Sequence, residues 1–173
     1  MKLKTLRDSD VFEKPEYDTP EEYQDRHTVK IIIKNQEGEI ALVTNPIHKL
    51  FLLAGGGAES DDLKSEAIRE ALEETSYHIE ILETFAEMEE FRNREAKHYL
   101  TTCFIAKAVE RNNEDLRTEE EKKNGLKVKW FSLDEGKKLM HEQAERVKKN
   151  EIKFYNTAFN VMRDFEFIKR LEN

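Results

Sequence analysis

The part of the sequence best equipped for chemistry is a glycine-rich stretch followed by a cluster of acids. It opens with three consecutive glycines, Gly55, Gly56 and Gly57. Further on, Glu70, Glu73 and Glu74 recur at the spacing that places side chains on one face of a helix. Carboxylates crowded on one face repel each other unless a cation neutralises them, and Mg²⁺ and Mn²⁺ prefer hard oxygen ligands. The spacing therefore predicts a divalent metal site.

The residues around these acids favour a site over an ordinary solvated helix face, which Glu-x-x-Glu-Glu alone would describe. Glycine lets the main chain approach a ligand closely, and such a loop can turn a carbonyl oxygen towards a metal. Arg69 precedes Glu73 by four residues, so it can pair with that acid and fix its orientation. The other side of the helix carries apolar residues suited to a core: Leu63, Ala67, Ile68, Ala71 and Leu72.

This stretch resembles the signature of the Nudix hydrolases. That signature is a Gly, five residues, a Glu, seven residues, and then Arg-Glu-aliphatic-x-Glu-Glu-x-Gly-aliphatic. Gly55 opens the match, and Asp61 takes the position of the first Glu. The core then follows in register without a gap: Arg69, Glu70, Ala71, Glu73 and Glu74. The resemblance implies an α/β fold, a Nudix-like α/β/α sandwich with a mixed β-sheet.

Four positions depart from the signature or from its usual surroundings. Asp61 keeps the negative charge of Glu but is one methylene shorter. Ser76 replaces the Gly that ends the helix in a left-handed turn, where a residue with a side chain costs roughly 1 kcal/mol. Tyr77 replaces the final aliphatic residue, and Leu53 stands where many relatives have Pro. We expect Asp61 to tune activity and not to abolish it.

The resemblance also implies a reaction. Members of the family generally hydrolyse a nucleoside diphosphate linked to another moiety, with water attacking a phosphorus while Mg²⁺ or Mn²⁺ neutralises the developing charge. Glu70 and Glu74 are the expected metal ligands. The backbone carbonyl of Ala54 or Gly55 is expected to complete the set, and the three glycines are expected to contact the substrate.

The catalytic set implied by the resemblance comprises Arg69, Glu73, Glu74 and a further acid. Glu73 is either a third metal ligand or a helper that Arg69 orients. Many relatives take the further acid, as ligand or general base, from a loop outside the signature. We expect Glu120 to fill this role, and the alternatives are Glu119, Glu121, Glu89 and Glu90. The sequence alone does not choose among them.

Two classes of function are compatible with these residues. The first is a metal-dependent hydrolase that cleaves a pyrophosphate bond in a nucleoside diphosphate-linked substrate, such as a (d)NTP or an oxidised nucleotide. The second is a Nudix-fold nucleotide-binding or regulatory module without turnover. Asp61 and Ser76 favour the module, whereas the complete Arg-Glu-x-x-Glu-Glu core favours the enzyme more strongly.

The length and composition fit one compact enzyme with a charged surface. Of the 173 residues, 38% are hydrophobic and 38% are charged, which suits a single domain with its own core. No stretch approaches the ~20 apolar residues that span a bilayer, and the first residues lack the apolar core of a signal peptide. The single cysteine, Cys103, excludes an intramolecular disulfide and is expected to be buried. We therefore expect a cytoplasmic protein with no membrane partner.

The net charge of −8 narrows the choice of partners. It disfavours binding to nucleic acid polymers, because their phosphates would be repelled. It does not disfavour a small nucleotide, since a metal ion can bridge an acidic protein and a phosphate. We expect a small-molecule nucleoside diphosphate derivative as the partner and a monomer or homodimer as the assembly.

Hydrophobic patterning divides the chain into an arm and one domain. Residues 1–26 are polar and predict an N-terminal arm or lead-in, and residues 27–173 predict a single Nudix-like domain with a C-terminal helix. Strands are expected at 29–33, 39–44, 51–53, 78–90, 97–109 and 127–131, with a turn at 35–38. The strands at 78–90 and 97–109 are expected to join around Asn93 and Arg94. Helices are expected at 62–75, after Ser132 or Asp134, and at about 151–171. Strands interleaved with helices suggest a mixed sheet between helices.

Overall fold

The computed structural model describes residues 1–45, 49–112 and 126–172. Within these ranges, seven strands form one mixed sheet. The strands are β1 Leu6–Arg7, β2 Gln24–Lys34, β3 Ile40–Asn45, β4 Leu50–Leu52, β5 Tyr77–Arg92, β6 Lys97–Arg111 and β7 Lys127–Phe131. The α-helices are α1 Asp8–Val11, α2 Leu63–Thr75, α4 Leu133–Lys148 and α5 Tyr155–Ile168, and a short 3₁₀ helix, η1, spans Asn93–Glu95.

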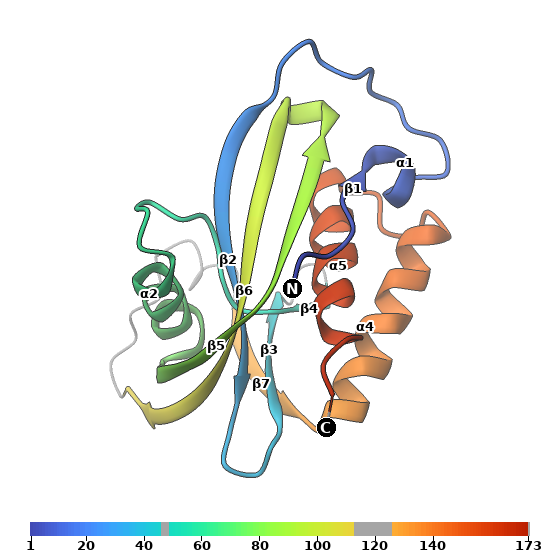
Figure 1. Ribbon diagram of the computed structural model, residues 1–173. Helices are drawn as coiled ribbons and strands as arrows, with labels where there is room; N and C mark the ends of the chain where they lie inside the picture. The colour runs from blue at the N-terminus through green and yellow to red at the C-terminus, as the bar shows by residue number, and fades with distance from the viewer. Residues whose placement is uncertain (46–48, 113–125, 173) are drawn as a thin grey trace.

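The sheet lies between two layers of helices. Its strand order is β1-β5-β6-β2-β3-β4, and β7 pairs with β3. The central strands β2 and β6 are parallel, whereas β5 and β6 form a long antiparallel pair. Helix α2 covers one face of the sheet, and α4 and α5 cover the other (Figure 1). The arrangement confirms the predicted α/β/α sandwich with a mixed sheet.

Strand β2 is buried on both of its faces, because helices lie on both sides of the sheet. Val29, Ile31 and Ile33 belong to the core beneath α2, together with small side chains of that helix. Ile32 points the other way and joins the core beneath α5. This alternation follows from the period of two in a strand. It explains why the sequence shows an apolar run at 29–33 that only Lys30 interrupts.

The connections between strands follow the sequence signals closely. In the predicted turn at 35–38, the Gly38 N–H donates to the Asn35 carbonyl, and Gly38 has a φ of 80°. Strands β5 and β6 join through η1, around Asn93 as expected. These observations confirm the turn and the long hairpin.

Helix α4 begins at a residue that caps its first turn. The Ser132 side chain accepts from the Glu135 N–H and the Glu135 side chain accepts from the Ser132 N–H, so Ser132 is the cap of α4. The expected C-terminal helix is α5 and is shorter than the range predicted for it. In the described part of the chain, no helix has the length and apolar character needed to cross a membrane.

Part of the N-terminal segment is built into the core. Leu3, Leu6 and Val11 are buried with residues of α5. Strand β1 adds to the sheet parallel to β5, and α1 follows it directly. Residues 1–26, expected as an arm or lead-in, therefore carry two short elements and the start of β2 as well as irregular chain. The sequence does not predict β1, because a strand of two residues is too short to show a periodic pattern.

Candidate active site

Helix α2 carries the predicted acids and has well-defined ends. At its start, the Asp62 side chain accepts from the Ser65 N–H at 3.2 Å. At its end, Ser76 adopts the left-handed conformation, with φ 61° and ψ 24°, and its N–H donates to the Leu72 carbonyl. This geometry confirms the prediction that Ser76 occupies the position where the signature has Gly.

The helix face that meets the sheet differs in part from the predicted one. Ala67 and Ala71 are buried as expected, but Ile68 is 40% exposed. The contact runs through the two alanines because their small side chains let α2 lie close to β2. Glu66 and Glu70 flank this contact and are buried as well. The expectation that Ile68 belongs to the core is therefore wrong.

Arg69 is the centre of an ion-pair cluster on α2. Its Nη1 lies 2.8 Å from a Glu73 carboxylate oxygen, which confirms the predicted pair. Its Nη2 lies 2.8 Å from Glu66 Oε2 and 2.7 Å from Glu70 Oε1. The hydrogen bond to Glu66 and the charges of the other two acids raise the pKa of the Arg69 guanidinium. Arg69 thus fixes three carboxylates at once.

Glu66 is a member of this cluster that the sequence reasoning missed. Besides Arg69, its carboxylate accepts from Ser60 Oγ at 2.9 Å. The hydrogen bond from Arg69 is the main reason that the pKa of Glu66 is lowered. Its spacing of three residues from Arg69 was the available signal. Asp61, by contrast, is exposed.

Glu70 packs directly against the glycine-rich loop. A Cβ added at Gly56 would lie 2.8 Å from Glu70 Oε2 and 2.9 Å from Oε1, so a side chain there would require the carboxylate to move from this position. Burial raises the pKa of Glu70, and the nearby charge of Arg69 opposes that shift only in part. The ionised carboxylate therefore lacks some of the stabilisation that water would give it.

Glu74 reaches the same loop one turn later. Its Oε2 accepts from the Gly55 N–H at 2.7 Å. Gly55 has a φ of 125°, and a Cβ there would collide with the main chain of Val29. The Gly55 carbonyl accepts from Lys30 Nζ at 2.6 Å. The loop thus contacts the carboxylates of both Glu70 and Glu74, and Lys30 holds one of its carbonyl oxygens.

The oxygen atoms at this loop are of the kind that Mg²⁺ or Mn²⁺ would accept. Glu70 and Glu74 both meet the loop, whereas Glu73 lies against Arg69. The Ala54 carbonyl accepts from the Ile31 N–H at 3.0 Å. Among the described residues, no group of three or more His, Cys, Asp or Glu side chains is arranged to hold a metal ion. A metal ion at this loop would therefore be held by two carboxylates and a loop carbonyl.

The candidates for a further acid fall in different places. Glu120, with Glu119 and Glu121, lies outside the described residues. Glu90 is fully buried beneath α5, where it pairs with Arg92 and Arg163.

Glu89 lies on a different side of its strand from Glu90. It pairs with Lys2 at 2.7 Å and lines a cavity of about 210 Å³ together with His27, Thr101 and Leu63. Because Leu63 is the first residue of α2, this cavity adjoins the start of the site helix. Glu89 is therefore the described candidate nearest to the start of α2.

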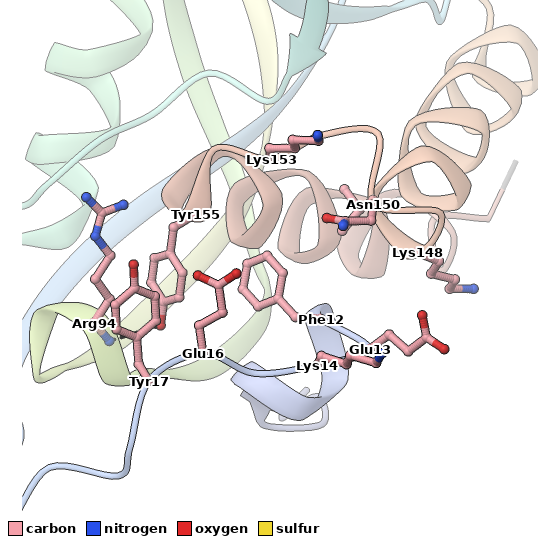
Figure 2. A pocket seen from close by; sticks show the side chains of 11 residues that line it. Phe12, Glu13, Lys14, Glu16, Tyr17, Arg94, Lys148, Asn150, Lys153 and Tyr155 are labelled. Carbon is pink, nitrogen blue, oxygen red and sulfur yellow. Dashed lines mark hydrogen bonds between the residues drawn. The ribbon is translucent and has the colours of Figure 1, made fainter.

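A larger cavity of about 500 Å³ lies on the α5 side of the sheet. Its walls come from the N-terminal segment and the connection between α4 and α5, and Figure 2 shows Phe12 and Tyr17 beside Tyr155. The ring of Tyr155 stacks on Phe12 with centroids 5.3 Å apart. Since α2 covers the opposite face, this cavity is separate from the candidate active site (Figure 1).

Comparison with known proteins places these features in a family. The model of the NUDIX domain matches residues 24–151, and no curated protein matches the chain. A NUDIX hydrolase from Nitrosomonas europaea has a similar structure, with a TM-score of 0.56 and 18% identity over 87% of this chain and 97% of that one. A UDP-X diphosphatase aligns with a TM-score of 0.49 and 20% identity over 66% of this chain and 54% of that one. A MutT protein from Methanosarcina mazei Go1 aligns with a TM-score of 0.48 and 22% identity over 68% and 83%.

The family match carries the assignment, because structural likeness at 18% identity shows the fold alone. The match spans more than half of the chain and includes β2, the glycine-rich loop and α2. These are the elements that bring Glu70 and Glu74 to the loop. The chain belongs to the NUDIX family.

Proposed function

We propose that this chain is a metal-dependent hydrolase that cleaves a pyrophosphate bond in a nucleoside diphosphate-linked substrate, such as a (d)NTP or an oxidised nucleotide. The observation that carries the proposal is the meeting of Glu70 and Glu74 with the glycine-rich loop. Two carboxylates and a carbonyl at one place suit a hard divalent cation. The same loop offers main chain without side chains, which suits a phosphate group.

Glu70, Glu74 and the carbonyl of Gly55 or Ala54 would hold Mg²⁺ or Mn²⁺. When bound, the ion would neutralise charge that develops on the phosphate oxygens. Arg69 keeps Glu70 in place by an ion pair of 2.7 Å and holds Glu73 beside it. Glu73 therefore acts as a helper in this proposal and can also serve as a third ligand.

The cavity beside the start of α2 is the proposed place for the rest of the substrate. Its walls combine apolar Leu63, Met88 and Leu100 with the polar side chains of His27 and Thr101. Such a mixture suits a base or sugar better than a second phosphate. Glu89 lines it and is a candidate general base, as is Glu120.

The proposed partner is a small molecule. The net charge of −8 supports a metal-bridged nucleotide over a nucleic acid polymer. Cys103 is buried, and burial raises the pKa of its thiol, so it behaves as an inert core residue. A reducing cytoplasm and a monomer or homodimer are consistent with these properties.

A substrate panel tests the proposal. Nucleoside triphosphates, oxidised nucleotides and nucleoside diphosphate sugars are incubated with the protein in Mg²⁺, in Mn²⁺ and in EDTA. Phosphate and pyrophosphate release are measured, and the nucleotide product is identified. We expect metal-dependent cleavage of a pyrophosphate bond in at least one class. Tight binding of a nucleotide without any cleavage would instead indicate a binding or regulatory module.

A further inference from the structure

Among the residues that the structure describes, strand β4, which leads into the glycine-rich loop, has a strand neighbour on one edge only. That neighbour is β3. On the other edge, the Phe51 N–H donates to Gln143 Oε1, and Gln143 Nε2 donates to the Phe51 carbonyl, both at 2.8 Å. A side chain of α4 thus replaces the missing strand. Main-chain N–H and C=O groups left unpaired at this edge would otherwise destabilise the folded protein.

Two further side chains continue this edge into the loop. Asp164 of α5 accepts from the Leu53 N–H at 2.9 Å. Lys30 of β2 donates to the Leu53 carbonyl at 2.9 Å and to the Gly55 carbonyl at 2.6 Å. Both polar groups of Leu53 are therefore held by buried, charged side chains. Gly55 is held by Lys30 through its carbonyl and by Glu74 through its N–H.

These side chains are fixed by their surroundings. Asp164 is fully buried, and Lys30 is only 7% exposed. The other oxygen of Asp164 accepts from Arg163 Nε at 2.9 Å, and Arg163 in turn pairs with Glu90. Buried charges stay stable only when they are paired and hydrogen-bonded, so this network has one well-defined arrangement.

Part of this network lies beyond the region that matches the family. The match ends at residue 151, whereas Asp164 belongs to α5, Tyr155–Ile168. The contacts run from α5 through Leu53 and Lys30 to Gly55, and from there to Glu74 of α2. Helices α5 and α2, on opposite faces of the sheet, therefore both contact the short stretch of main chain at residues 53–55.

We propose that Lys30 and Asp164 are positioning residues, which set the direction of the Gly55 carbonyl and fix the glycine-rich loop relative to Glu74. This proposal rests on the proposed function in taking that carbonyl and Glu74 as parts of a metal site. Lys30 supplies a fixed ammonium group to two carbonyls that would otherwise repel each other. Without it, the loop loses the position from which Glu74 and Gly55 can bind one ion.

The test measures Mn²⁺ binding to the full-length protein without substrate, by calorimetry or electron paramagnetic resonance. Lys30→Met and Asp164→Ala remove the contacts to Leu53 and are expected to weaken Mn²⁺ affinity about tenfold or more. Lys30→Arg can still donate to both carbonyls and should recover most of the affinity. Tyr155→Phe is the matched control, because it removes a buried hydrogen bond to Asp8 of 2.7 Å away from the loop.

Hydrogen exchange of the Leu53 and Gly55 amides gives a second readout that needs no metal. We expect Lys30→Met to lose protection at both amides while β2 and β6 stay protected. The proposal would be overturned if Lys30→Met bound Mn²⁺ within about twofold of the wild-type affinity, or more tightly than wild type. It would also be overturned if Tyr155→Phe lost as much Mn²⁺ affinity as Lys30→Met. If wild type binds no Mn²⁺, the proposed function fails, and the exchange data still decide the positioning role. If Lys30→Met does not fold, the Mn²⁺ affinities of Lys30→Arg and Asp164→Ala are compared instead.

Discussion

Glu70 is a carboxylate placed where its charge is poorly stabilised unless a cation is present. It is 9% exposed, packs on Gly56, and pairs with Arg69. Arg69 also serves Glu66 and Glu73, so one positive charge is shared by three negative ones. A carboxylate arranged in this way is suited to binding a metal ion, but its charge destabilises the metal-free protein.

This arrangement predicts that Glu70→Gln leaves the metal-free protein as stable as wild type or more stable at neutral pH. Glutamine keeps the size and can accept from Arg69, but it removes the charge. Because burial raises the pKa of Glu70 in the folded state, ionisation opposes folding at neutral pH. Urea denaturation in EDTA measures the effect. Glu73→Gln, at a more exposed position, is the control and should lose at most about 1 kcal/mol. A loss well above that for Glu70→Gln would contradict this account.

At the residue scale, the sequence predicted those contacts that are local on the helix. The pair of Arg69 and Glu73 followed from a spacing of four residues. Lys30 was missed because its partners, Leu53 and Gly55, lie 23 and 25 residues away in the chain. The one signal was a lysine inside an apolar strand, where an unpaired charge would not be tolerated.

At the scale of elements, the end of α2 shows a local strain that the sequence announced. Ser76 has a φ of 61°, a conformation that suits Gly better than a residue with a side chain. Strands with clear apolar patterning were predicted well, as were the turn at Gly38 and the hairpin of β5 and β6. The elements β1 and α1 were missed, because neither is long enough to show a periodic pattern.

The strain at Ser76 predicts that Ser76→Gly stabilises the protein by up to about 1 kcal/mol. A change to Gly elsewhere normally destabilises, so the sign of the effect is diagnostic. Lys149→Gly is a matched control, since Lys149 ends α4 with an ordinary φ of −81° and should lose stability on substitution. Chemical denaturation of both variants decides the matter. A clear loss in Ser76→Gly would show that the helix end is not strained.

At the scale of the whole molecule, the two layers of helices have different tasks. Helix α2 supplies the acids on one face of the sheet, and α4 and α5 hold the main chain of Phe51 and Leu53 from the other face. The sandwich itself could be predicted from the order of strands and helices. The bracing of β4 could not, because it depends on contacts more than 90 residues apart in the chain.

Metal should stabilise the whole molecule, because the acidic site is preformed in the folded state only. Binding raises the free energy of unfolding by about 2.7 kcal/mol when the free metal is at a hundred times its Kd. Thermal melting in EDTA and in millimolar Mg²⁺ or Mn²⁺ measures this shift. Glu74→Gln should show less protection than wild type. Identical melting curves for wild type with and without metal would speak against a preformed site.

The central claim is that carboxylates held against the glycine-rich loop drive hydrolysis of a pyrophosphate bond. The most direct measurement is the turnover number of Glu74→Gln on the best substrate of the panel at saturating Mg²⁺. Glutamine keeps the size of Glu74 but removes a hard anionic ligand, so turnover should fall by orders of magnitude while the melting temperature in EDTA changes little. Glu142→Gln, an exposed acid of α4, is the control and should keep wild-type turnover. Equal activity in the two variants would contradict the assignment of the site.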